Sequence, residues 1–370
     1  MTSAAQNNNS SYWKDYPEYK ILKDADTFNT DELLATKMPP RKFIVDKIMD
    51  DEGMDITMAR AKDLKTYLEL HKCACIATGR PFLGLHTEKG KILYIDEENG
   101  IRRLQRRIEK IVIGLQLTES ELKELHQNLI FSSLKNIVID DIKHLKQIID
   151  LVTKHQPILI VCDSLVRVRI MKENESGDAR VVFQNLKKIC SEAGMDIKFN
   201  FLHHVTKSSG KGDWLVPEDA RGSGDFMGQV NTLLILERDA PTNNGVQFFR
   251  LRIGLSRDDS DSGFIGIKFK IYDKLFADKP GIVFESYGTI SLHEIKDKKI
   301  KKSEKIAQKI IAWARNSTIL PRKIKREDLR QFDDESSTST VDIAIDLLVE
   351  RKEMKESDKS GWYEVVETDW

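Results

Sequence analysis

The sequence predicts an α/β fold with a mostly parallel sheet, an antiparallel extension of that sheet and a C-terminal domain of a different kind. Three observations predict it. Short apolar runs alternate with amphipathic helical runs up to about His204, helical runs are absent from Asn231 to about Ser286, and they return from Ser303. Strands that are apolar on both faces and alternate with helices are typical of parallel sheets, whereas consecutive strands favour antiparallel pairing.

The alternating part contains three strands, each accompanied by a helix. Helical runs repeat apolar residues every three or four positions, and the strands are short apolar stretches that end in a polar residue. The predicted strands are residues 91–96, 157–163 and 196–204. The predicted helices are residues 101–115, 142–155 and 179–194. Ligands bind at the carboxyl ends of strands in open α/β sheets, so the polar strand ends are candidate site residues.

Further β-rich runs, separated by turn residues rather than helices, form the predicted antiparallel extension. They are residues 231–237, 246–256, 263–273 and 281–286. We therefore predict one α/β domain over residues 28–287. The polar, Asn- and Ser-rich lead-in over residues 1–27 is expected to be mostly disordered.

A basic linker over residues 288–302 leads to a last predicted domain, residues 303–370. This region has three short helical runs, followed by a basic turn and a short aromatic strand. Three short helices before a β-ribbon favour a winged-helix-like domain. A small helical dimerisation or capping unit is the alternative, because short helices are common and no base-contacting residue can be identified by pattern.

Composition favours a globular protein. The 370 residues are 40% hydrophobic, and 59 basic residues balance 59 acidic ones, so net charge gives no reason to expect nucleic acid. Cys73, Cys75, Cys162 and Cys190 lie in apolar runs without metal-binding spacing, which favours reduced core thiols and a cytoplasmic location. No apolar run approaches the ~18 residues of a membrane span, and the N-terminus lacks the order of a signal peptide. We therefore expect no membrane partner.

A damaged phosphate-loop pattern follows an apolar run near residue 54. A phosphate loop needs G-x-x-x-x-G-K-[ST] after a strand, because backbone N–H groups enclose the phosphates while the lysine and the hydroxyl reach phosphate and Mg²⁺. The same spacing here gives Ala59, Leu64, Lys65 and Thr66. The Lys–Thr pair begins an apolar-periodic helix, whose N-terminus favours an anion. Taken alone, the pair is better interpreted as the start of an ordinary surface helix.

Acidic residues follow two of the predicted strands. Glu98 is the best-placed candidate to orient water for attack on a γ-phosphate, with Glu97 and Asp96 as alternatives. Asp163 ends an apolar strand and can hold Mg²⁺ together with Thr66. Each of these carboxylates can also be explained as a cap for the helix that follows.

Histidines and arginines follow later strands. His203 and His204 are adjacent in an extended segment and point to opposite sides, so a hydrogen-bonding sensor of phosphate is favoured over a shared metal site. Arg221 and Arg257 are candidates to stabilise the charge of a phosphoryl transition state, including across a subunit boundary. Either can instead be a surface arginine paired with nearby aspartates. The loop over residues 207–214 is either a nucleic-acid contact or a plain surface loop.

The linked motifs resemble the RecA-like P-loop ATPases of the plasmid RepA hexameric-helicase family over about residues 28–273. The segments that carry the resemblance are, in order, ARAKDLKT, CIATGRPFLG, ILYIDEENGIRRLQRRI, ILIVCDSLVRV, FNFLHHVTKSSG and ARGSGDFMGQVNTLLILER. The resemblance implies a RecA-like P-loop core that binds ATP through Lys65 and Thr66. It also implies that Mg²⁺ is held by Thr66 and Asp163.

The same resemblance assigns catalytic roles and partners. It implies that Glu98 is the catalytic base and that His203 with His204 senses the γ-phosphate. Arg257 would act from a neighbouring subunit of a ring or filament, and Arg221 matches the R-G-S segment of the family. The implied function is a DNA-dependent ATPase or helicase in replication or recombination, with single-stranded or origin DNA as its partner.

The sequence departs from this family at Ala59 and Leu64, where the family has glycine. Leu64 is the more severe change, because the loop needs a close backbone approach and dihedral angles that glycine supplies. We therefore expect impaired nucleotide binding. The competing hypothesis is a non-catalytic DNA-binding or scaffold protein that retains the fold.

Overall fold

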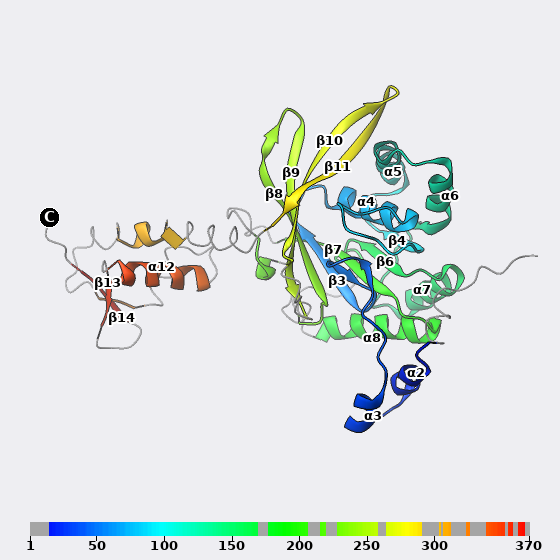
Figure 1. Ribbon diagram of the computed structural model, residues 1–370, viewed down its shortest axis with the longest axis horizontal. Coiled ribbons are helices and arrows are strands. Elements are labelled where there is room, and N and C mark those ends of the chain that lie inside the picture. Colours follow the sequence, from blue (N-terminus) through cyan, green and yellow to red (C-terminus); the bar gives the residue numbers. More distant parts are fainter. Residues whose placement is uncertain are drawn as a thin grey trace, which may run out of the picture.

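Figure 1 shows the protein as a computed structural model. The structure describes residues 15–168, 177–205, 215–219, 228–257, 264–290, 303–304, 306–311, 323–325, 338–351, 354–357 and 362–366. Arg221, the loop 207–214 and most of the predicted linker 288–302 lie outside the described residues.

A nine-stranded sheet forms the body of the molecule, with strand order β11-β10-β9-β8-β3-β7-β6-β4-β5. The parallel strands are β3 (Met54–Ala59), β4 (Ile92–Asp96), β5 (Leu129–Ser133), β6 (Leu159–Asp163), β7 (Lys198–His204) and β8 (Thr232–Asn243). The antiparallel strands beyond β8 are β9 (Val246–Ser256), β10 (Gly266–Phe276) and β11 (Lys279–Thr289). This sheet confirms the predicted RecA-like α/β core with a mostly parallel sheet and an antiparallel extension.

Helices cover both faces of the sheet (Figure 1). They are α4 (Lys65–Thr78), α5 (Ile101–Leu115), α6 (Glu119–Asn128), α7 (Ile142–His155) and α8 (Gly177–Ala193). Apolar residues of α4, α5 and α6 belong to one buried cluster, and those of α7 and α8 belong to a second. Because α5 and α7 carry apolar residues at helical spacing, both helices form over the predicted ranges.

Several elements differ from the sequence prediction. Helix α6 and edge strand β5 were not predicted, because α6 is largely polar and β5 is short and only partly buried. The predicted lead-in contains helix α2 (Pro17–Asp24), which the ion pair from Lys23 to Asp196 (2.6 Å) joins to the segment before β7. A capped helix α3 (Thr30–Ala35) follows, and then the antiparallel pair β1 (Phe43–Val45) and β2 (Met49–Asp50).

The C-terminal part has its own small apolar cluster. Helical residues 306–311 pack with α12 (Thr338–Glu350) and a three-stranded sheet of order β12-β14-β13. Its strands are β12 (Lys323–Lys325), β13 (Met354–Glu356) and β14 (Trp362–Val365). The predicted middle helix, residues 325–332, lies outside the described residues except for Lys325, so the winged-helix-like domain stays a prediction.

All four cysteines are free thiols, and Cys73, Cys75 and Cys162 are buried. Burial raises the pKa of the Cys75 thiol to about 12. Three of the four thiols therefore lie in the core, as predicted, whereas Cys190 is only partly buried. Within the described ranges, no helix is long and apolar enough to cross a membrane.

Candidate active site at the end of the parallel strands

The loop between β3 and α4 adopts left-handed backbone angles without glycine. Asp63 N–H donates to the Arg60 carbonyl (3.3 Å) to close a turn, within which Lys62 has φ 71°. Leu64 has φ 57° and ψ 22° and directly precedes the first residue of α4. Such angles favour glycine and cost a β-carbon-bearing residue free energy. The loop thus takes conformations that glycine usually supplies, at Leu64 with a side chain packed against the core.

Lys65 is buried at the start of α4 and is 5% exposed. Its Nζ donates a hydrogen bond to the backbone carbonyl of His203 (3.0 Å). Burial lowers the pKa of this ammonium to about 8, although Asp163 and Glu98 nearby favour the charged form. A desolvated cation at a helix N-terminus is well placed to attract an anion.

Asp163 ends β6 and faces the loop. Its Oδ2 accepts hydrogen bonds from the Thr66 hydroxyl (2.9 Å), the Tyr94 hydroxyl (3.1 Å) and the Asn99 amide (3.0 Å). Its Oδ1 is buried and has no hydrogen-bond partner among the described residues. Burial raises the pKa of this carboxyl, against the effect of Lys65. An unpaired carboxylate oxygen beside a hydroxyl is the hard oxygen donor set that Mg²⁺ prefers, so these residues fit the predicted cation.

The three consecutive carboxylates at the end of β4 have different hydrogen-bond partners and different exposure. Asp96 accepts hydrogen bonds from the backbone N–H groups of Asn99 and Gly100 and from the Ser133 hydroxyl. Glu97 accepts from the backbone N–H groups of residues 135, 136 and 137. Both carboxylates therefore shape loops, whereas Glu98 is the exposed one of the three.

Glu98 pairs with a histidine from a neighbouring part of the sheet. Its Oε2 lies 3.7 Å from Nε2 of His204, the last residue of β7. The approach of the His204 ring lowers the pKa of Glu98 to about 2, and the carboxylate is ionised at neutral pH. His204 lies beside Ala59 in the β3–β7 register, which brings the pair to the phosphate loop. His203 is buried and contributes its carbonyl to Lys65.

Arg257 is not brought to this site within the same chain. It follows Ser256, which pairs with Thr232 at the start of β8, whereas Leu236 of β8 pairs with Ala59 beside the loop. The Arg257 guanidinium instead donates to the Gly228 carbonyl. A role for this arginine in another subunit's site stays a prediction.

Comparison with known proteins gives the family. A protein-family model described as an AAA domain matches residues 20–210, which is more than half of the chain and includes the loop, Glu98, Asp163 and both histidines. The chain belongs to the AAA domain family. The predicted kinship with RecA-like P-loop ATPases is thereby confirmed. A search of the curated proteins found no match.

Solved structures resemble this AAA domain at low sequence identity. The ATPase domain of G40P is 12% identical, with 75% of this chain and 99% of that chain covered and a TM-score of 0.45. A DnaB-like replicative helicase is 12% identical, with 62% and 57% covered and a TM-score of 0.43. A KaiC-like protein from Pyrococcus horikoshii OT3 is 14% identical, with 66% and 94% covered and a TM-score of 0.41.

Sequence reasoning missed several side chains of the AAA domain's site. Tyr94 and Asn99 hold Asp163 but belong to a buried strand and a capping loop, so no pattern distinguishes them. The Arg107 guanidinium lies 5.3 Å from the centroid of the Tyr67 ring, one residue after Thr66. Its Nη1 is buried without a hydrogen-bond partner in the described part of the chain. Arg107 lies in the Arg-rich run over residues 102–107, whose charges by themselves are compatible with either a DNA contact or a solvated face.

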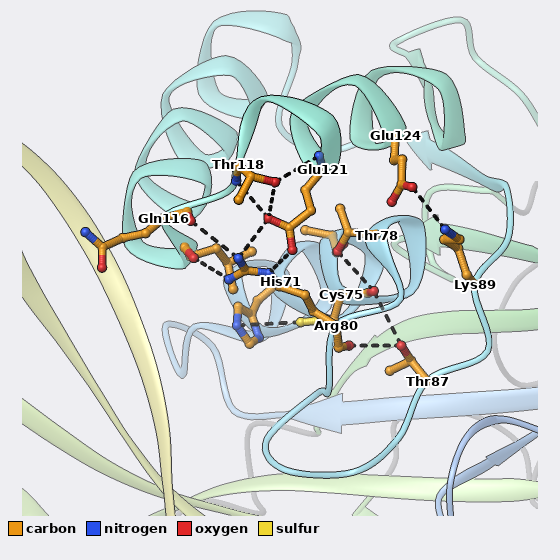
Figure 2. A network of polar contacts seen from close by, with 12 residues as sticks. His71, Cys75, Thr78, Arg80, Thr87, Lys89, Gln116, Thr118, Glu121 and Glu124 are labelled. Atoms are coloured by element: carbon orange, nitrogen blue, oxygen red, sulfur yellow. Dashed lines mark hydrogen bonds and ion pairs between the residues drawn. The ribbon is translucent and has the colours of Figure 1, made fainter.

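The other end of α4 in this AAA domain carries a polar network of a different kind (Figure 2). The Arg80 guanidinium donates to both carboxylate oxygens of Glu121 (2.6 and 2.9 Å) and to the Leu115 carbonyl (2.5 Å). The Thr87 hydroxyl donates to the Arg80 carbonyl (2.9 Å). Arg80 thereby joins the end of α4 to the end of α5 and the start of α6. No group of the phosphate site takes part in these contacts.

Proposed function

We propose that this AAA domain binds ATP with Mg²⁺ and hydrolyses it, in a multi-subunit assembly that acts on DNA. The observation that carries the proposal is the convergence of Lys65, Thr66, Asp163 and Glu98 at the carboxyl ends of the parallel strands β3, β6 and β4. A lysine, a hydroxyl, a buried carboxylate and an exposed carboxylate are the groups that phosphoryl transfer to water requires.

Each side chain has a distinct task in this proposal. Lys65 offers a buried positive charge to the terminal phosphates, and Thr66 with Asp163 would hold Mg²⁺, which neutralises phosphate charge when bound. Glu98, which is ionised at neutral pH and lies beside His204, orients and polarises a water molecule. His204 can exchange its contact with Glu98 for a hydrogen bond with a phosphate oxygen, which makes it a sensor of the nucleotide.

The conformation of Leu64 favours the ATPase over the scaffold alternative. A phosphate loop usually has glycine at this position because glycine adopts left-handed backbone angles without steric cost, and Leu64 adopts the same angles, with φ 57°. The buried and desolvated Lys65, together with the unpaired oxygen of Asp163, costs folding free energy that a purely structural protein need not retain. One observation supports the scaffold alternative. Leu64 places a side chain at the phosphate loop, where the backbone must approach the phosphate closely.

The DNA partner and the assembly are proposed from the resemblance of the motif set to the RepA-type helicases. Arg102, Arg103 and Arg106 are exposed on α5, directly after the Glu98 loop, and can contact a phosphate backbone. Arg257 lies far from its own phosphate loop, as expected for a residue that acts on a neighbouring subunit's nucleotide. A replication or recombination role in the cytoplasm is consistent with these proposals.

Purified protein assayed for ATP binding by calorimetry, and for hydrolysis with and without single-stranded DNA, tests the proposal. We expect measurable hydrolysis that DNA stimulates and that Lys65→Ala abolishes. The matched variant Ala59→Gly/Leu64→Gly should bind ATP more tightly. If the native chain binds no ATP while the glycine variant does, the scaffold alternative is correct and the enzyme is not.

The C-terminal region is tested separately. Deletion of residues 303–370 should weaken DNA binding at moderate salt and leave the α/β core folded, because the region has its own apolar cluster. Binding of a DNA duplex and of a single strand by fluorescence anisotropy, with circular dichroism as the folding control, measures this. Equal DNA affinity in the full and shortened chains would remove the winged-helix-like proposal.

A further inference from the structure

We propose that Arg238 is a positioning residue for the phosphate loop. Its ion pair with Asp63 holds the loop in the left-handed conformation that glycine would otherwise provide. The inference rests on the proposed ATPase function, because it explains how a loop without glycine can still receive a nucleotide. Asp63 lies between the two residues with positive φ, Lys62 and Leu64.

The ion pair joins the loop to strand β8 of the sheet. Nε of Arg238 donates to Oδ1 of Asp63 over 2.9 Å, and the Asp63 side chain is only 7% exposed. Oδ2 of Asp63 is buried and has no hydrogen-bond partner among the described residues. Arg238 is thus the ion-pair partner of this buried carboxylate among the described residues, with the charge of Arg60 acting on it as well. A buried carboxylate that loses its ion-pair partner is strongly disfavoured.

Arg238 is itself fixed by the antiparallel strands. Its Nη2 donates to the Gln247 side chain (3.2 Å), and the guanidinium lies 5.1 Å from the centroid of the Phe249 ring. Phe249 is fully buried in the same core cluster against which Leu64 packs. These contacts direct the guanidinium toward the loop, while the Arg238 side chain as a whole is 39% exposed.

The strand register explains why an arginine at this position reaches the loop. β8 pairs in parallel with β3, with Leu236 beside Ala59, the last residue before the loop. Arg238 is two residues further along β8 and so lies beside the loop as it leaves the sheet. Because alternate residues of a strand face the same side, a shift of one residue would turn the guanidinium away.

The left-handed angles and the ion pair are therefore linked. The backbone angles at Leu64 cost free energy, and the Asp63–Arg238 pair restrains the residue directly before it. If this restraint is the role of Arg238, its importance depends on the residue at position 64. With glycine at position 64 the left-handed angles carry no steric cost, and the arginine becomes dispensable for loop shape.

The test is a double-mutant cycle of Arg238→Ala and Leu64→Gly, with ATP hydrolysis as the readout. We expect Arg238→Ala to raise KM for ATP by about tenfold or more while kcat changes much less, since the loop binds phosphate in ground and transition states alike. In the Leu64→Gly background the same change should alter KM by less than about threefold. Asp63→Asn, which removes the pair from the loop side with little change in shape, should behave as Arg238→Ala does.

Lys270→Ala is the matched control. It removes an ion pair with Glu285 (3.1 Å) and a contact with the Tyr272 ring (5.8 Å) in the same antiparallel strands, without touching the loop. It should leave KM unchanged. An unchanged KM in both Arg238→Ala and Asp63→Asn would overturn the inference. An increase that Leu64→Gly fails to reduce would overturn it as well, because it would show a role unrelated to position 64.

Hydrogen exchange separates failure of this inference from failure of the proposed function. If the native chain hydrolyses no ATP, the proposed function fails, and exchange of the nucleotide-free protein over residues 59–66 then decides the inference. Faster exchange of this segment in Arg238→Ala than in the native chain and Lys270→Ala supports it. Equal exchange in all three overturns it.

Discussion

The two ends of α4 have the same left-handed backbone conformation but different residues that adopt it. Both are bounded by a residue with left-handed angles: Leu64 with φ 57° before the helix, and Gly79 with φ 74° after it. At the C-terminal end glycine adopts these angles without steric cost, and Arg80, Thr87 and Glu121 pair their polar groups with one another and with the backbone (Figure 2). At the N-terminal end a leucine adopts them.

The N-terminal end also leaves polar groups unpaired. Lys65 is desolvated, and one carboxylate oxygen each of Asp63 and Asp163 has no hydrogen-bond partner among the described residues. Strain and unpaired buried polar atoms concentrate where a protein binds or reacts, whereas paired networks stabilise the scaffold. One helix therefore carries the proposed phosphate site at its first turn and a stabilising junction at its last.

The largest effect is expected at the strained end. Lys65→Ala should reduce ATP affinity and turnover by about 100-fold or more, because no other described cation occupies its place at the loop. The free energy of unfolding should stay equal or rise, since burial of this ammonium, whose pKa is lowered to about 8, is unfavourable by roughly 3 kcal/mol. Calorimetric ATP titration and urea unfolding measure the two effects. Lys89→Ala, which removes an exposed ion pair with Glu124 (3.0 Å), is the control.

Arg80→Ala, at the C-terminal end of α4, should lower stability and leave ATP binding unchanged. It leaves the Leu115 carbonyl without the Arg80 donor and Glu121 with only its hydrogen bonds from Thr118, and we expect a loss of about 2–3 kcal/mol in stability, reduced somewhat by partial solvent exposure. KM for ATP should stay unchanged in the folded protein. A raised KM at unchanged stability would show that this end of α4 is not simply structural.

His71, in the middle of α4, should make the free energy of unfolding depend on pH. Its ring stacks on Phe284 with centroids 4.2 Å apart, and burial lowers its pKa to about 3. Below the unfolded-state pKa of about 6.5 the unfolded chain binds a proton that the folded chain does not, so stability falls as pH falls. From pH 7 to 5 this group should cost about 2 kcal/mol.

The measurement is urea unfolding of the native chain and of His71→Leu at pH 7 and pH 5. The variant is expected to lose less stability than the native chain between the two pH values. Equal losses would mean that the imidazole is protonated in the folded protein, against the burial of its ring.

The smallest effects on stability are expected from substitutions at the two positions with left-handed backbone angles, 64 and 79. Gly79→Ala should cost about 1 kcal/mol, because alanine pays the steric cost that glycine avoids. Leu64→Gly relieves the corresponding cost but removes apolar packing, so stability should change by less than about 1 kcal/mol while ATP affinity increases. Thermal unfolding and ATP titration of both variants test the comparison directly. A weaker ATP affinity in Leu64→Gly would show that the leucine side chain contributes to binding.

Periodicity predicted much of the fold because the relevant signals are local. Helices α5 and α7 and strand β9 lie within the predicted ranges, since apolar spacing and turn residues set them. Helix α6 and strand β5 were missed, because a polar helix and a short edge strand have weak patterns. Strands β8 and β11 extend beyond their predicted ranges, because pairing with a neighbouring strand continues past the apolar residues.

The sequence by itself determined the order of the motifs, and therefore which residues stand at the strand ends. Lys65 and Thr66 could be proposed from their spacing, and Glu98 and Asp163 from their places at predicted strand ends. Each of these signals is weak by itself, and the order of the whole set carried the prediction. Local patterns also indicated that a leucine interrupts this loop.

Only the tertiary structure decided how that loop is held and which carboxylate is free. Glu97 is committed to backbone groups almost forty residues away, which leaves Glu98 exposed. Asp63 and Arg238 are 175 residues apart in the sequence and form an ion pair because parallel pairing of β3 with β8 brings both to the same end of these strands. Contacts between residues so distant in sequence depend on strand order and register, which no local pattern specifies.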